Sequence, residues 1–118
     1  MTWSDIYMHL KAEGFAVYSL GQHKGKCTDP YLVLRDNGVS RRKSIEVQEY
    51  EILLYYPMDR YSGFSGYVET VKNSMNRLYP ALKLTEDEQP HYLDDEKMAY
   101  MTSLIYQNSR ISRVNRIN

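Results

Sequence analysis

The sequence predicts a single α+β domain, in which an antiparallel or mixed four-stranded sheet carries two helices packed on one face. Two segments with helical spacing flank segments with the alternation of strands. The chain has 118 residues, the length of one domain, and its 42% apolar and 25% charged residues are typical of a folded protein. We expect residues 1–108 to form this domain and residues 109–118 to form a basic C-terminal tail.

The first helix is predicted over residues 3–13. Thr2 and Asp5 have the spacing of a capping box, and Gly14 supplies a stop. The apolar side chains that recur at helical spacing are Trp3, Ile6, Tyr7 and Leu10.

Three strands are predicted next, over residues 15–20, 31–35 and 44–56. Asp36, Asn37 and Gly38 resemble a turn that closes the second strand. The apolar positions of the third strand are Ile45 and Val47, then Tyr50, Ile52, Leu54 and Tyr56. Because side chains alternate between faces, this shift from odd to even positions predicts a bulge near residues 48–49.

The second helix is expected to begin at Ser62 or Ser65 and to end before Pro80. Its apolar stripe consists of Phe64, Val68, Val71, Met75 and Leu78. A small domain needs a helix to cover its sheet, so we interpret this stripe as core and not as a groove for a partner.

Residues 86–96 contain six carboxylates, no Lys or Arg, and Pro90, which predicts a solvated loop. A last strand is expected over residues 98–107. Twelve tyrosines against two phenylalanines favour either contact surfaces or half-buried sheet positions, and both interpretations stay open.

Composition limits the function classes. Fifteen basic and fifteen acidic residues balance, so no global field attracts nucleic acid or a membrane. Cys27 is the sole cysteine, which rules out an intrachain disulfide. No stretch approaches the ~20 apolar residues that span a bilayer, and the N-terminus lacks the pattern of a signal peptide. We therefore expect a soluble protein with no membrane partner.

Residues 21–28 resemble a phosphate-binding loop but fail in detail. The spacing is one residue short of the P-loop motif, Cys27 replaces the magnesium-binding hydroxyl, and Asp29 and Pro30 do not open a helix. We interpret the segment as a basic connection between strands. No nucleotide cofactor is predicted.

Metal and acid–base sites are also not predicted. His23 and Cys27 could share a metal, but His9 and His91 lie in unrelated contexts, and structural zinc needs four ligands at defined spacings. The adjacent carboxylates of residues 94–96 have no nucleophile or oxyanion motif beside them. We expect no catalytic residue.

Charge is segregated along the chain. Residues 21–43 carry six basic side chains against two acidic ones, whereas residues 86–96 are purely acidic. Such patches could meet head to tail between copies, in contacts that close into a ring, or could simply be solvated. The tail, with an arginine every third position, could order on a partner or fray.

Five stretches carry a resemblance to a known family. Residues 17–27 and 30–34, together with residues 55–57, 67–72 and 92–97, are similar to small proteins encoded among the head–tail joining genes of tailed bacteriophages and prophages of Gram-positive bacteria. The nearest role in that group is the tail terminator, or tail-to-head joining protein.

This resemblance implies a non-enzymatic virion protein of the tail or neck, made in the bacterial cytoplasm. It implies a hexameric ring on the head-proximal end of the tail tube, with tube and neck or head-completion proteins as partners. DNA would meet the ring only by non-specific passage. The alternatives are a head-closure or adaptor protein, and a nucleotide- or nucleic-acid-binding protein using the basic 24–43 surface.

From charge and resemblance together, we expect a set of charged side chains to contact subunits or partners. The set is His23, Lys24, Lys26, Arg41, Arg42, Lys43, Asp94, Asp95, Glu96, Arg110, Arg113 and Arg116. The loop of residues 41–43 is expected to point toward the ring's channel or a neighbouring subunit, because clustered cations avoid burial.

Overall fold

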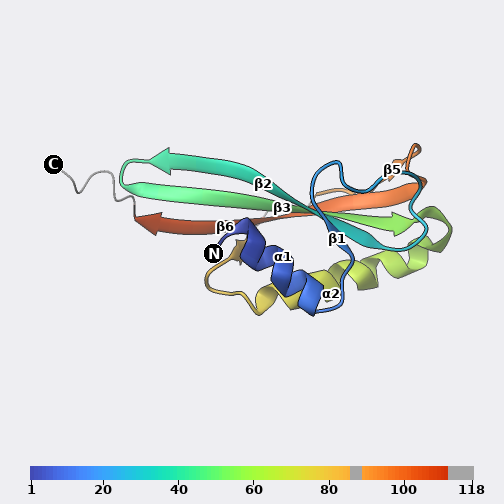
Figure 1. Ribbon diagram of the computed structural model, residues 1–118, viewed down its shortest axis with the longest axis horizontal. Coiled ribbons are helices and arrows are strands. Elements are labelled where there is room, and N and C mark those ends of the chain that lie inside the picture. The colour runs from blue at the N-terminus through green and yellow to red at the C-terminus, as the bar shows by residue number, and fades with distance from the viewer. Residues whose placement is uncertain (86–88, 112–118) are drawn as a thin grey trace.

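A computed structural model describes residues 1–85 and 89–111, over which the chain forms two α-helices, one 3-10 helix and six strands (Figure 1). The elements are α1 (Trp3–Ala12), β1 (Val17–Tyr18), β2 (Tyr31–Arg42), β3 (Ile45–Pro57), η1 (Met58–Gly63), α2 (Phe64–Asn76), β4 (Lys83–Leu84), β5 (Tyr92–Asp94) and β6 (Ala99–Ile111). The α+β class is therefore confirmed.

The predicted number of four strands is wrong. The sheet has six strands in the order β1-β2-β3-β6-β4, with β5 also paired to β6. It is mixed because β1 runs parallel to β2, while the other pairings are antiparallel. The additional strands β4 and β5 are two and three residues long, too short to produce a sequence period.

The predicted capping box begins α1. The Thr2 hydroxyl accepts a hydrogen bond from the Asp5 amide at 3.2 Å, and the Asp5 carboxylate accepts one from the Thr2 amide at 2.9 Å. One face of the helix then buries Ile6 and Leu10 completely. The start and the buried face of this helix are as predicted.

The second predicted helix is divided into η1 and α2. Gly63 precedes α2 without a side-chain cap, so neither Ser62 nor Ser65 has the capping role predicted for it. The predicted stripe is buried at Phe64, Val68, Val71 and Met75, and Leu78 packs against the same core. The stripe covers the sheet, as predicted.

Both helices lie on one face of the sheet (Figure 1). This face carries the main core, in which Leu32, Leu34, Ile52 and Leu54 meet the helices. The opposite face carries a second, smaller cluster. Its members are Cys27, Tyr31, Val33, Tyr55, Ala99 and Met101.

The connection between β1 and β2 supplies Cys27 to that second cluster and leads directly into strand β2. The Cys27 amide donates a hydrogen bond to the Lys97 carbonyl at 2.7 Å, and its thiol lies 3.3 Å from the Asp29 carbonyl. The segment thus connects strands, and no helix N-terminus follows it to receive a phosphate.

β2 differs from its prediction at Asp36–Gly38. These residues do not close the strand; they form a bulge in which the register with β3 shifts, and β2 continues to Arg42. The hairpin turn lies instead at Lys43 and Ser44, where Lys43 has a φ of 55°. The same small polar residues serve turns and bulges, which explains the error.

The bulge predicted in β3 is also misplaced. β3 pairs with β6 without interruption from Ile45 to Pro57, and the irregularity lies across from it, in β2. The shift of the apolar residues from odd to even positions along β3 has another cause. Ile45 and Val47 lie where neither face of the sheet is buried, so no constraint fixes which face they occupy.

The boundaries predicted for the acidic loop, the last strand and the tail also differ from those of the structure. β5 lies within the predicted acidic loop, and β6 continues past residue 107 to Ile111, so residues 109–111 belong to the sheet and not to the expected tail. Arg113 and Arg116 lie outside the described residues. Within the described part of the chain, no helix is both long and apolar enough to span a membrane.

Candidate assembly surface

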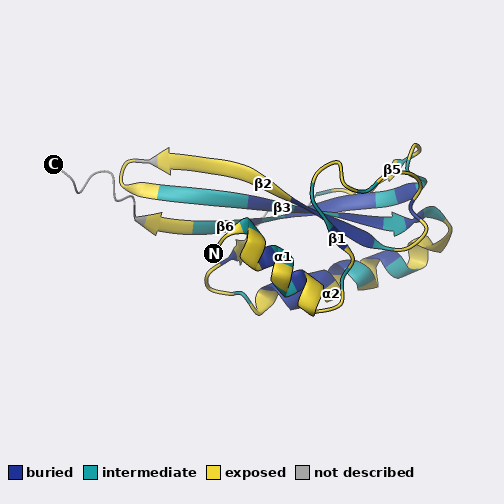
Figure 2. Ribbon diagram, in the orientation of Figure 1, coloured by how far each residue is buried: buried dark blue, intermediate teal, exposed yellow. Residues whose placement is uncertain are grey.

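Half of the sheet projects beyond the helices. We define the arm as residues 35–49 and 107–111, which include the outer parts of β2, β3 and β6 and the turn between β2 and β3. Figure 2 shows the arm in yellow and teal, because none of its described side chains is buried. The arm contributes to the elongated shape of the molecule, which measures 57 × 26 × 24 Å.

A charged triad joins the arm strands near the tip. Glu46 of β3 lies between Arg41 of β2 and Arg110 of β6 in the sheet register. One Glu46 oxygen pairs with Arg41, and the other accepts from Arg110 Nε at 3.1 Å. The hydrogen bond from Arg41, followed by that from Arg110, holds the pKa of Glu46 below its usual value. The triad carries a net positive charge at neutral pH.

Amide side chains connect the strands nearer the body. Asn37 donates to Glu49 at 3.2 Å and to Glu51 at 3.1 Å, and Gln48 donates to Asp36 Oδ1 at 2.6 Å. Exposed polar contacts of this kind stabilise weakly, because water competes for the same groups. The arm therefore has cross-strand bonds but no apolar core of its own.

The predicted basic segment 21–43 is divided between the two ends of the molecule. Arg41, Arg42 and Lys43 lie at the arm tip, beside the end of β6 that contains Arg110. The loop that contains Lys24 and Lys26 is bonded through Cys27 to Lys97, just before β6 begins. At ~3.3 Å per residue, the 13 residues of β6 separate these groups by roughly 40 Å.

His23 belongs to an aromatic stack on the sheet face opposite the helices. Its ring lies 3.8 Å from that of Tyr31, which in turn stacks on Tyr55 at 4.7 Å. Burial, and secondarily the charge of Lys97, lowers the pKa of His23. His23 packs on Tyr31 within its own chain, and its contact with a partner stays a prediction.

The acidic residues 94–96 form the turn between β5 and β6. Asp94 Oδ1 accepts hydrogen bonds from the Glu96 amide at 3.1 Å and the Lys97 amide at 3.2 Å. Asp95 and Glu96 are exposed. This turn lies at the end of the molecule far from the arm tip (Figure 1), so residues 94–96 are separated from Arg41, Arg42 and Lys43 along the long axis, whereas the loop with Lys24 and Lys26 lies at the same end as the turn.

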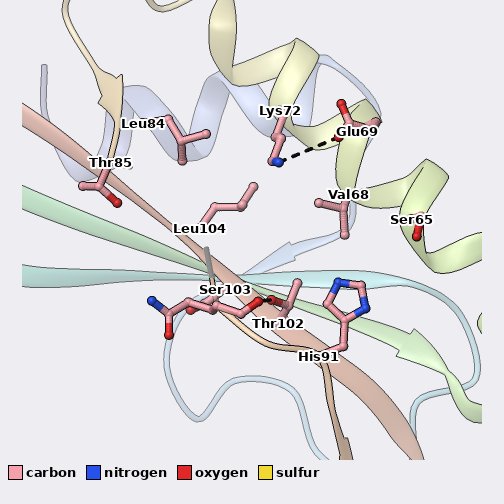
Figure 3. Close-up of a pocket in the computed structure, with 11 residues that line it drawn as sticks. Ser65, Val68, Glu69, Lys72, Leu84, Thr85, His91, Thr102, Ser103 and Leu104 are labelled. Atoms are coloured by element: carbon pink, nitrogen blue, oxygen red, sulfur yellow. Dashed lines mark hydrogen bonds and ion pairs between the residues drawn. The ribbon is translucent and has the colours of Figure 1, made fainter. Parts of the chain in front are cut away.

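A cavity of about 270 Å³ lies between α2 and the edge of β6 (Figure 3). Val68, Leu84 and Leu104 give it an apolar wall, and Lys72 Nζ lies 3.7 Å from Glu69 Oε1 at its margin. His91 also lines the cavity, but its Nδ1 lies 3.2 Å from the Tyr61 hydroxyl. Within the described residues, neither cavity serine, Ser65 or Ser103, forms a hydrogen bond with His91.

Ser74, His9 and Glu13 form a second polar group, and their residue types are those of a catalytic triad. Ser74 Oγ lies 3.2 Å from His9 Nε2 and 3.0 Å from Glu13 Oε1. His9 Nε2 also lies 2.9 Å from the Ser74 carbonyl, which can only accept, so this nitrogen carries the proton and cannot serve as a base. Ser74 is 2% exposed. The group therefore joins α1 to α2, and its serine is buried between them.

Of the charged residues predicted to contact partners, the structure brings Arg41 and Arg110 together through Glu46, which the sequence did not single out. A possible signal was the stretch from Arg35 to Glu49, where charged and polar residues interrupt every apolar run. Among sets of three or more His, Cys, Asp and Glu in the described residues, none is placed to hold a metal ion.

Comparison with protein-family models found no family that matches this chain, and comparison with curated protein sequences found no significant match.

Proposed function

We propose that this chain is a structural protein of the bacteriophage head–tail junction, which caps the head-proximal end of the tail tube as a ring and offers a joining surface to the neck. It acts by contact between subunits, without catalysis. The proposal rests on the resemblance of residues 17–27, 30–34, 55–57, 67–72 and 92–97 to head–tail joining proteins. The observation that carries it in the structure is the arm.

The arm is better suited to protein contact than to any other use. A three-stranded ribbon without a buried face gains little stability from its own packing. Its outer strands carry backbone donors and acceptors along open edges, and it exposes the apolar side chains of Val39 and Ile45. A neighbouring subunit would supply the burial that the arm lacks alone.

The two charged ends support contacts between different surfaces of successive subunits. The tip carries Arg41, Lys43 and Arg110, and the opposite end exposes Asp95 and Glu96. Heterologous contacts of this kind close into rings when the rotation permits. Complementary charge would guide the approach and select the partner more than it would add affinity.

A nucleic-acid-binding function is less well supported. It was predicted for one continuous basic surface over residues 24–43, and the separation of Lys24 and Lys26 from the tip by roughly 40 Å leaves no such surface. What favours it is the tip alone. Retention of the purified chain on DNA with a steep salt dependence would support this alternative.

The direct test is to add the purified chain to growing tail tubes of the phage or prophage that encodes it. We expect a ring at one tube end by electron microscopy, and tubes that stop lengthening. Charge-neutralised tips, with Arg41→Gln and Arg110→Gln together, should cap poorly. Neutralising the opposite end, with Asp95→Asn and Glu96→Asn, should weaken capping as well, because it removes the acidic side of the same contact. Lys11→Gln, on the exposed face of α1, is the matched control and should cap normally.

Two results would contradict the proposal. Tubes that lengthen unchanged in the presence of folded protein would exclude the capping role. Binding to the head or portal complex, with none to the tube, would instead favour the head-closure or adaptor alternative.

A further inference from the structure

The outer edge of β2 is open along the arm. β1 pairs with β2 only at Leu32 and Val33, and the Trp3 indole donates to the Leu34 carbonyl at 2.9 Å. From Arg35 to Arg42 no strand of the described chain lies along this edge (Figure 1). An edge of this length presents a row of backbone donors and acceptors to another strand.

Three side chains of this edge share one face of the sheet. Asp36, Val39 and Arg41 lie across from Tyr50, Gln48 and Glu46, which alternate along β3 and therefore point to the same side. The bulge at Asn37 produces this arrangement, because it inserts one residue between Asp36 and Gly38. The face thus shows an acid, an apolar residue and a base, in that order.

We propose that the free chain pairs with a second copy of itself along this edge, β2 against β2, antiparallel about a two-fold axis at Val39. An acid–apolar–base sequence is self-complementary when read in opposite directions. The axis sets each Arg41 opposite the Asp36 of the partner subunit, and it sets the two Val39 side chains against each other. Moving the axis by one residue, to Gly38 or Ser40, sets Asp36 or Arg41 opposite valine instead.

The two charged groups can make these contacts without leaving their own partners uncompensated. Both hydrogen bonds that Asp36 accepts from the described residues, from the Gly38 amide and from Gln48, use Oδ1, which leaves Oδ2 to accept from a partner. Arg41 has five N–H donors, and its side chain is 49% exposed. Glu46 stays paired with Arg110 when Arg41 turns toward the partner subunit.

The features that protect this edge from unrelated strands also permit pairing with one specific partner. A bulge and charged side chains discourage pairing with unrelated strands, while a strand with matching charges is still accepted.

This contact is distinct from the ring. A two-fold contact uses the same surface on both copies, whereas a ring needs two different surfaces. The pair is therefore a state of the unassembled protein in which the β2 edge is covered, and it stands or fails independently of the proposed function.

Solution mass tests the pairing. The wild-type chain should have twice the 13.9 kDa of one copy by sedimentation or light scattering. Asp36→Arg and Arg41→Asp should each be monomeric, because each faces like charge with like. An equimolar mixture of the two variants should recover the dimer, because both contacts are then between opposite charges. Circular dichroism checks that each variant is folded.

Cross-linking tests the position of the axis. Val39→Cys should form a disulfide-linked dimer on mild oxidation, because residues directly opposite on antiparallel strands have Cβ atoms about 4.5–5.5 Å apart. Ile45→Cys is the matched control. It is equally exposed, 49% against 50% for Val39, but it lies on the central strand and should not cross-link.

Three outcomes overturn the inference: a wild-type monomer at every concentration, a variant mixture that stays monomeric, or Val39→Cys that links no faster than Ile45→Cys. A ring that caps tubes while Val39→Cys fails to cross-link would reject this pairing and leave the proposed function intact.

Discussion

Ile52→Ala should destabilise the fold far more than the same substitution at Ile45, on the same strand. Ile52 is fully buried, between Leu34 of β2 and Leu104 of β6, and it belongs to the main core. Removing three carbons there loses transfer free energy and leaves a cavity that paired strands on both sides cannot close. The expected loss is about 3 kcal/mol or more, within the range for buried Ile→Ala.

Ile45 gives a control of identical chemistry. It is 49% exposed and lies on the arm, so Ile45→Ala should lower the free energy of unfolding by less than about 1 kcal/mol, mainly through lost β propensity. Urea unfolding of dilute protein measures both values, provided that the slopes agree among variants. Equal losses at the two positions would refute the assignment of core and arm.

Three further predictions concern single contacts. Cys27 is 6% exposed, and burial raises its pKa to about 11, so a thiol reagent should modify it slowly in the folded chain and rapidly in denaturant. Because the folded-state pKa of Glu46 is depressed, its stabilisation of the arm should be present above its unfolded value of about 4.5 and be lost as pH falls through the folded value. Amide exchange of the arm should show this loss, and Glu46→Gln should remove the pH dependence. Ser74→Ala should lower stability by about 1 kcal/mol, since His9 keeps its bond to the Ser74 carbonyl.

Each of these three predictions would be contradicted by a specific result. Equal modification rates of Cys27 in folded and unfolded chains would mean that solvent reaches the second apolar cluster, to which Cys27 belongs. If the protection of the arm amides against exchange is lost to the same extent at low pH in Glu46→Gln, the effect belongs to another group. A loss above about 3 kcal/mol in Ser74→Ala would show that the residue does more than join two helices.

Some features of the fold follow from local patterns. The spacing of Thr2 and Asp5 begins α1 because the hydroxyl and carboxylate satisfy amides three residues away, whatever lies outside the helix. The stripe from Phe64 to Met75 predicts which side of α2 faces the sheet, because a period of 3.6 aligns these residues. The α+β class follows from these helices and the strands between them.

The number of strands and the arm were decided by tertiary structure. β4 and β5 form because β6 provides a strand for them to pair with. At two and three residues, they are too short to show the alternation that predicts a strand. The extension of β2 past Gly38 depends on β3 lying beside it, since the same residues would otherwise turn.

The candidate surface shows the same division. Composition alone identified the clustered charges of residues 41–43 and 94–96, because charge belongs to the residue. Their placement at opposite ends, and the position of Glu46 between Arg41 and Arg110, required the register of three strands from distant parts of the chain. A sequence states which charges a protein has, but only the folded sheet decides which of them face each other, because Coulomb interactions depend on distance in space.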